Sequence, residues 1–277
     1  MSVTFPEGGR NDMRPLRIAN CSGFFGDRMS ALAEVADEPG IDVITGDYLA
    51  EVTMLVLAKS KAKHPDGGYA STFLRQLEPA LDRIAAAGIK VVSNAGGLDP
   101  HGLATALREM IASAGHSLSV AVVDGDDLTG NLDGLAAQGH HLEHLETGQP
   151  LASWPHEPLT VNAYLGGWGI AAGLAGGADI VVTGRVTDAS VVVGPAAWWH
   201  GWSRTDFDAL AGAVVAGHLV ECGTQVTGGN YRDIAGTANR DPGDSSAQPA
   251  TDARGASHPP VACSTSGRSS SSARYPR

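Results

Sequence analysis

The stretch IKVVSNAGGLDPHG, residues 89–102, shows in one place how this chain alternates its elements. Residues 89–93 form a short apolar run rich in β-branched side chains, which is typical of a buried strand. A helix is expected directly afterwards, because Asp99 is a good N-cap and Pro100 suits the first helical position. The polar and glycine residues between the two elements are more than a simple turn requires. This turn is therefore a candidate wall of a ligand site.

The same alternation continues along most of the chain. Short apolar runs predict strands at residues 16–20, 41–45, 89–93, 118–123, 159–164 and 180–183. Apolar residues at helical spacing predict helices at 29–35, 48–61, 72–87, 100–114, 166–177 and 207–220. Strands that alternate with helices indicate an α/β fold with a mostly parallel open sheet and helices on both faces.

The composition excludes several classes of partner. The 277 residues carry a formal net charge of -11, so the chain lacks the basic surface needed for nucleic acid or an anionic membrane. The cysteines are few and far apart, which argues against a disulfide framework. The chain also contains neither a signal-like N-terminus nor an apolar run of about 18 residues. We expect a cytoplasmic protein that has a small-molecule partner and binds neither nucleic acid nor membrane.

Three segments differ in composition. Residues 1–13 are expected to be a flexible N-terminus, and residues 14–231 are expected to form the α/β domain. From residue 232 to residue 277, large apolar side chains nearly vanish, while Ser, Pro, Arg, Ala and Gly dominate. Such a stretch buries too little apolar surface to offset its ordering entropy. We expect a disordered tail, and the abrupt change favours a translated frameshift as its origin.

Polar residues that follow the predicted strands form the candidate site, because ligands bind outside the carboxyl ends of parallel strands. Carboxylates and imidazoles supply acid/base chemistry, arginine pairs with carboxylate or phosphate, and glycines let backbone N–H groups approach an anion. The catalytic candidates are Asp47, Asp188 and His101. The substrate-binding candidates are Asn94, Gly96, Gly97, Arg185, Ser22 and Asp27.

Plainer explanations remain open for several of these residues. Arg185 and Asp188 can pair with each other, or Asp188 can cap the following helix. Asp99 would compete with any anion at its helix N-terminus. The run DGDD, residues 124–127, suits either a hard cation or a capping role, so we assign no metal and specify no cofactor.

Other motifs are interpreted as structural. The glycines of GGWGIAAGLAGG, residues 166–177, depart from the dinucleotide-binding spacing and indicate close helix–sheet packing. The histidines of QGHHLEHLETGQP, residues 138–150, indicate an exposed loop rather than a metal tract. Cys222 is interpreted as a packed thiol rather than a nucleophile. The aromatic run WWHGW, residues 198–202, either packs as a lid on the core or lines an apolar pocket.

Several longer motifs resemble the N-terminal domain of the acyclic terpene utilisation (AtuA) family. They are CSGFFGDR (21–28), TGDYLAE (45–51), VVSNAGGLDP (91–100), VTGRVTDAS (182–190) and GHLVECGTQVTGGNY (217–231). The resemblance covers roughly residues 14–231 and implies a part in the breakdown of citronellol- and geraniol-type compounds through acyl-CoA intermediates. Members of the family continue well past the last motif, where this chain departs, so the resemblance also implies a truncated chain.

From the loops and the resemblance together, we expect an enzyme of acyclic terpenoid or branched acyl-CoA catabolism. Its partner would be a small acyl or terpenoid ligand, and a homo-oligomer is left open. One alternative is a non-catalytic ligand-binding or assembly subunit of such a pathway. The other alternative is an inactive truncation product.

Overall fold

The computed structural model describes residues 14–140, 142–223 and 261–265. Its strands are β1 Leu16–Asn20, β2 Val43–Gly46, β3 Lys90–Ser93, β4 Val120–Val123, β5 Ile180–Thr183 and β6 Val261–Thr265. They form one sheet in the order β4-β5-β3-β2-β1-β6, and its neighbouring strands run parallel. The predicted parallel α/β fold is confirmed.

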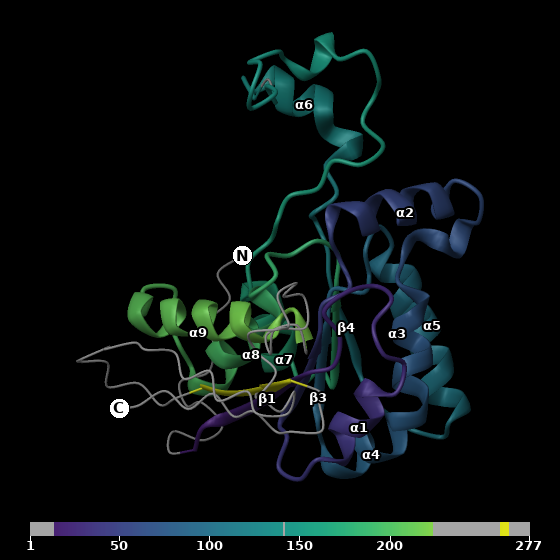
Figure 1. Ribbon diagram of the computed structural model, residues 1–277, viewed down its shortest axis with the longest axis vertical. Coiled ribbons are helices and arrows are strands. Elements are labelled where there is room, and N and C mark those ends of the chain that lie inside the picture. The colour runs from purple at the N-terminus through teal and green to yellow at the C-terminus, as the bar shows by residue number, and fades with distance from the viewer. Residues whose placement is uncertain (1–13, 141, 224–260, 266–277) are drawn as a thin grey trace, which may run out of the picture.

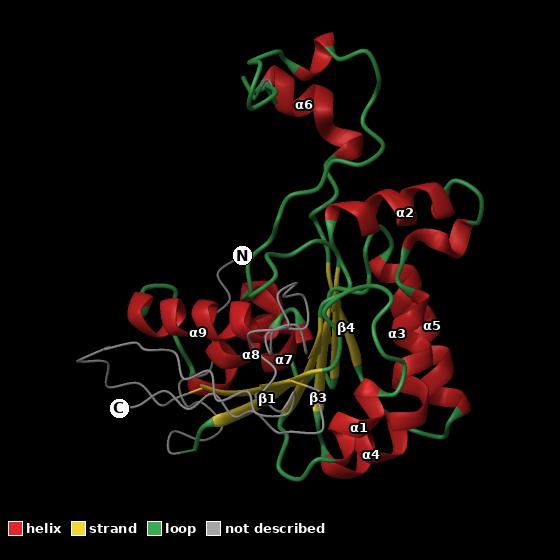
Figure 2. Cartoon of the chain, viewed as in Figure 1, coloured by secondary structure: helices red, strands yellow, loops and turns green. Residues whose placement is uncertain are grey.

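Helices cover both faces of this sheet, as expected. They are α1 Ala31–Asp37, α2 Glu51–Lys61, α3 Ser71–Leu77, α4 Leu81–Ala87, α5 Pro100–Ser113, α6 Leu132–Ala137, α7 Trp168–Ala175, α8 Ser190–His200 and α9 Phe207–Val220. Figure 2 shows α1, α3, α4 and α5 on one side of the strands and α7, α8 and α9 on the other. Helix α2 lies across the end of the sheet from which the strand–helix turns emerge (Figure 1).

Strands β1 to β5 each supply side chains to two separate apolar clusters. Ile44 packs with the α1, α3, α4 and α5 side chains, whereas its neighbour Val43 packs with α7, α8 and α9. Val91 and Val92 divide in the same way. Successive side chains of a strand point to opposite faces, and both faces are buried here. This explains why the strands are continuous apolar runs rather than alternating ones.

Two predicted elements differ from the structure. The helix expected at 72–87 is interrupted by the 3-10 turn Glu78–Ala80, because Pro79 has no backbone N–H to continue the helical hydrogen bonds. The strand expected at 159–164 is wrong, since this segment makes only the isolated antiparallel bridge Asp127↔Asn162. This segment is not part of the six-stranded sheet, so its apolar composition alone misled the prediction.

Residues 127–166 leave the body of the molecule as a projecting segment, which we call the arm (Figure 1). It contains α6 and the 3-10 turns Thr129–Asn131 and Leu151–Ser153. The sequence predicted an exposed loop at residues 138–150 but did not predict α6. The backbone of the arm is anchored where Ala163 N donates to Asp126 O at 2.7 Å.

The predictions for the two ends of the chain fall mostly on residues that the structure does not describe. The expected flexible N-terminus, residues 1–13, and most of the expected disordered tail, residues 232–277, are not described. Within the tail, β6 pairs with β1 from Leu16↔Val261 to Asn20↔Thr265, a strand that the sequence did not predict. Among the helices of the described residues, none combines the length and the apolar character that crossing a membrane requires.

Candidate functional site

The register of the sheet brings three strand ends to the same level. Gly46 pairs with Ser93, and Ser93 pairs with Val182. The turns that follow β2, β3 and β5 therefore begin side by side. Asp47 is the first residue after β2, and Asn94 is the first residue after β3.

Asp47 is held firmly at this edge. Its Oδ1 accepts a hydrogen bond from Asn94 Nδ2 at 2.6 Å and another from Leu49 N at 3.1 Å. Asn94 Oδ1 in turn accepts from Tyr48 N at 2.8 Å, so the same amide binds both the side chain and the backbone of the β2 turn. Asp47 is only 5% exposed, and its position is fixed by these contacts.

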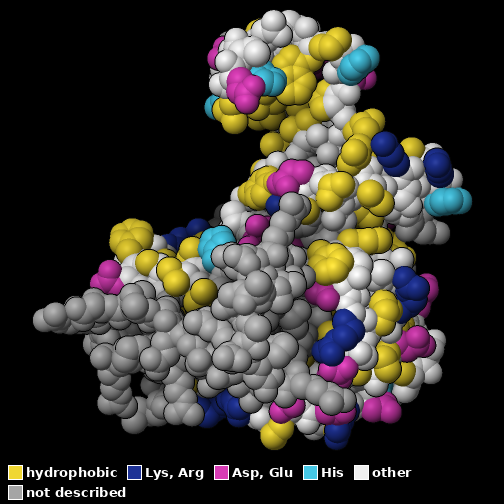
Figure 3. Space-filling model, viewed as in Figure 1, with side chains coloured by type: hydrophobic (Ala, Val, Ile, Leu, Met, Phe, Trp, Pro, Cys, Tyr) yellow, Lys and Arg dark blue, Asp and Glu magenta, His cyan; other side chains and the backbone are white. Residues whose placement is uncertain are grey.

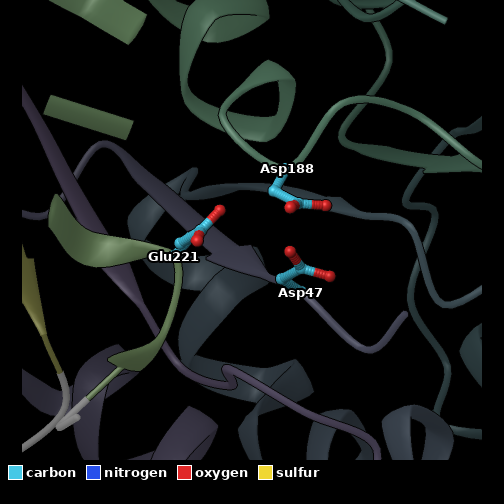
Figure 4. A group of neighbouring side chains, drawn as sticks. All are labelled: Asp47, Asp188 and Glu221. Carbon is cyan, nitrogen blue, oxygen red and sulfur yellow. The ribbon is translucent and has the colours of Figure 1, made fainter. Parts of the chain in front are cut away.

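Three carboxylates converge at this point. Ligand oxygens of Asp47, Asp188 and Glu221 all lie within 4.8 Å of one another, and Figure 4 shows them approaching from three separate segments. Asp188 precedes α8, and Glu221 directly follows α9. Asn20, the last residue of β1, secures the end of α9 by donating from Nδ2 to Glu221 O at 2.8 Å.

Burial changes the acidity of this cluster. Desolvation raises the pKa of Asp47 to about 7, and the nearby charge of Asp188 adds to the effect. The Asn94 and Leu49 hydrogen bonds and the Arg185 charge oppose it. Burial also raises the pKa of Glu221, again with the Asp188 charge as the second cause. At neutral pH, Asp47 therefore exists in both protonated and ionised forms.

Arg185 is the cation beside these acids and is itself buried, at 3% exposure. Its Nη1 donates to Leu49 O at 2.7 Å, while its Nη2 lies 3.4 Å from Asp188 Oδ1 and 3.6 Å from Glu51 Oε1. The alternative in which Arg185 pairs with Asp188 is thus observed. No hydrogen-bond partner for Nε occurs among the described residues.

Tyr164, from the base of the arm, completes the surroundings of Arg185. The guanidinium lies 4.3 Å above the centre of the tyrosine ring, a cation–π geometry. The hydroxyl donates to Glu51 Oε1 at 2.5 Å, which lowers the pKa of Glu51 and raises that of Tyr164. Arm, α2 and the β5 turn therefore meet at one corner of the site.

Other predicted site residues have structural contacts of their own. His101 is exposed, and its Nε2 lies 2.7 Å from Asp124 Oδ2, away from the three-carboxylate cluster. Ser22 Oγ donates to Phe24 O at 3.0 Å. Asp27 accepts from Gly23 N at 2.9 Å, so Ser22 and Asp27 both shape the turn after β1.

The paired glycines are explained by close packing. A Cβ on Gly96 would lie 2.4 Å from Thr183 O, the backbone of β5. Gly97 has φ +53, and its N–H already donates to Asn94 O at 3.2 Å. Asp99 accepts from Gly102 N at 2.9 Å, which confirms it as the N-cap of α5.

The residues of the other motifs each have their own structural partners. In the DGDD run, Asp124 pairs with His101, Asp126 accepts from Arg185 N at 2.7 Å, and Asp127 accepts from Thr129 N at 2.9 Å. The expected packing of Cys222 is wrong, because this residue is exposed. Partial desolvation and the charge of Glu221 still raise the pKa of its thiol, which disfavours the nucleophilic thiolate.

Close packing explains the glycine-rich and aromatic motifs. Cβ atoms on Gly169 and Gly173 would meet Val123 and Ala121 of β4, so the predicted helix–sheet packing is confirmed. In the aromatic run, Trp199 and Trp202 are buried in the α8 and α9 cluster, as the core-lid interpretation expected.

Sequence reasoning missed Glu221, Asn20 and Tyr164. Glu221 stands inside the motif GHLVECGTQ, where the neighbouring cysteine drew attention instead. Asn20 offered a weak signal, since a polar amide ends an otherwise apolar strand. Tyr164 offered none, because its place beside Arg185 depends on the path of the arm.

A comparison with protein-family models identifies the family of this chain. The model described as "Acyclic terpene utilisation family protein AtuA" matches residues 16–251. The chain belongs to the AtuA family. No curated protein and no solved structure matches it. The AtuA match includes each segment that supplies the carboxylate cluster, and it extends past residue 231, where the resemblance was expected to end.

The cluster has two chemical capabilities. A carboxyl group with a pKa about 7 can both accept and release a proton at neutral pH. Three converging carboxylates can also coordinate a hard divalent cation, which prefers oxygen ligands.

Proposed function

We propose that this AtuA-family chain is an enzyme of acyclic terpenoid or branched acyl-CoA catabolism, with Asp47 as its acid/base residue. The family supports a part in acyclic terpene utilisation. The observation that carries the proposal is the buried Asp47 carboxyl, fixed by Asn94 and shifted to a pKa of about 7. Proton transfer to or from a substrate carbon or hydroxyl is the chemistry that such a group performs best.

Arg185 would bind an oxygen of the substrate. Its Nη2 contacts with Asp188 and Glu51, at 3.4 and 3.6 Å, are longer than charge-assisted hydrogen bonds. A carbonyl or carboxylate oxygen of an acyl substrate can therefore replace them at small cost. Glu51 is 81% exposed in its side chain, so a ligand can displace it from Arg185 by breaking its hydrogen bond from Tyr164.

The test uses a citronellol-type acyl-CoA thioester, incubated with the full chain in deuterium oxide. We expect deuterium to enter at the carbon next to the thioester carbonyl, with Asp47 removing and returning the proton. Asp47→Asn should slow incorporation by about 100-fold or more. The matched control is Asp127→Asn, an exposed carboxylate on the arm. Equal rates in the wild type and Asp47→Asn would exclude this role.

The same protein and thioester also test the non-catalytic alternative, which predicts a different outcome. A ligand-binding or assembly subunit would gain thermal stability with the thioester, yet neither exchange nor consume it. A cytoplasmic location is part of the proposal, because the chain has only three widely separated cysteines.

A second candidate is a divalent cation held by Asp47, Asp188 and Glu221. It is favoured by the convergence of the three carboxylates, and by Asp188 Oδ1 and Glu221 Oε2, which are buried without hydrogen-bond partners among the described residues. Thermal melting with Mg²⁺ or Mn²⁺ tests it. The melting temperature should rise with the cation in the wild type and in Asp127→Asn, but not in Glu221→Gln. No rise in the wild type excludes the site.

A further inference from the structure

The arm, residues 127–166, lacks a core of its own. None of its described residues is buried, although they include apolar side chains: Leu145 is 102% exposed, Leu159 65% and Trp154 38%. A segment of this length with no fully buried apolar side chain gains little free energy to offset the entropy of ordering it. We therefore expect the apolar side chains of the arm to pack against a surface outside the arm.

Helix α2 presents a second apolar surface that its own chain leaves open. Val52, Leu55 and Val56 are 66%, 41% and 48% exposed, whereas Met54 and Leu57 are buried against the body. The three exposed residues have the i, i+3, i+4 spacing that places side chains in one stripe along a helix. We call this surface the α2 stripe. Figure 3 shows apolar side chains over α2, next to basic ones.

The two surfaces carry opposite charges. The arm has five carboxylates, including Glu143 and Glu146 beside Leu145, and contains no Lys or Arg. Helix α2 ends among Lys59, Lys61 and Lys63, which are all exposed. An acidic arm and a basic helix end match in charge as well as in apolar character.

We propose that two copies of this chain pair, with the arm of each copy lying on the α2 stripe of the other. The arm projects from the body, and Figure 1 shows α6 standing off from α2 of the same chain rather than lying on it. Each copy offers one arm and one stripe, and a two-fold axis makes both contacts at once. Leu145 and Trp154 would cover Val52 and Val56, while Glu143 and Glu146 would face the partner's lysines.

The proposed contact between the two copies would also lie next to the carboxylate site. Glu51 begins α2, and Tyr164 stands at the base of the arm. Both surfaces of the proposed contact are thus continuous with the corner that holds Arg185. The pairing does not depend on which reaction the carboxylates perform.

The first test is the mass of the full chain by size-exclusion chromatography with light scattering. We expect a dimer, twice 28.4 kDa. Val52→Asp with Val56→Asp should give a monomer, and so should Leu145→Asp with Trp154→Ala. All of these residues are exposed, so the circular dichroism spectrum should not change. The control is Phe207→Asp, whose side chain is 70% exposed on α9, a helix that lies apart from α2 and α6 in Figure 1. This variant should stay dimeric.

The second test reverses charges. Lys59→Glu with Lys63→Glu should weaken pairing about 10-fold or more, and so should Glu143→Lys with Glu146→Lys. All four changes in one chain should restore it. A wild type that is monomeric at every concentration overturns the proposal. A dimer that survives both apolar double variants also overturns it, because the copies would then pair through another surface.

Discussion

Asn94 Nδ2 lies 2.6 Å from Asp47 Oδ1, which joins the residues that directly follow β3 and β2. The bond opposes the effect of burial, because it favours the ionised carboxylate that burial disfavours. The pKa of Asp47 settles at about 7 as the result of these competing causes. Acid/base behaviour at this site is therefore a property of the pair.

Asp47 should make the protein less stable as the pH rises. Its folded pKa of about 7 lies above the ordinary value of 3.8, so the folded state holds the proton more tightly. The stability it contributes is full below pH 4 and is lost as the pH rises through 7. Between pH 5 and pH 8 the loss should be about 2 kcal/mol. Asp47→Asn, measured by urea unfolding, should lack this loss, whereas Asp127→Asn should keep it.

Removing Asn94 should raise the pKa of Asp47 above 7, because the amide hydrogen bond that favours ionisation is lost. Asn94→Ala also leaves Tyr48 N without its acceptor, which should lower stability by about 2 kcal/mol. The pKa is measured by carbon-13 NMR titration of the aspartate carboxyl groups. A downward shift of the Asp47 pKa would contradict this account.

Gly96→Ala should disrupt the contact between the β3 turn and β5. The added Cβ would stand 2.4 Å from Thr183 O, and backbone atoms cannot move aside cheaply. We expect a loss of about 3 kcal/mol of stability in denaturant unfolding. The matched control is Gly130→Ala on the arm, where no atom lies within 4 Å of the new Cβ. Equal losses in the two variants would show that packing is not the reason for Gly96.

Asp126 should be the carboxylate of the DGDD run that matters for folding. It accepts from Arg185 N at 2.7 Å and from Asn162 Nδ2 at 3.0 Å, which ties the base of the arm to the β5 turn. Asp126→Ala should cost about 2 kcal/mol and make the arm more sensitive to protease. Asp124→Ala removes an exposed pair with His101 and should cost about 0.5 kcal/mol or less. The reverse ranking would contradict this assignment.

Local sequence patterns predicted many of the strands and helices correctly. The strand at Ile180–Thr183 and the helix at Phe207–Val220 have the bounds that the sequence predicted. Apolar runs, N-caps and closing glycines are short-range signals, so they survive in one sequence. The errors lie where a residue depends on distant contacts. The apolar run at 159–164 reads as a strand, but it lies in the base of the arm, away from the parallel strands.

Local sequence patterns were enough to assign the α/β class, to place polar residues at the strand ends, and to select Asp47, Asn94, Arg185 and Asp188 as site candidates. Only the tertiary structure added Glu221, because the end of α9 reaches the cluster through Asn20, some 200 positions earlier. It also paired His101 with Asp124 rather than with the three-carboxylate cluster, and gave the glycines of the β3 turn a packing role. The physical reason is that a parallel sheet sets strand ends in register by pairing across long sequence separations, and no local pattern encodes that pairing.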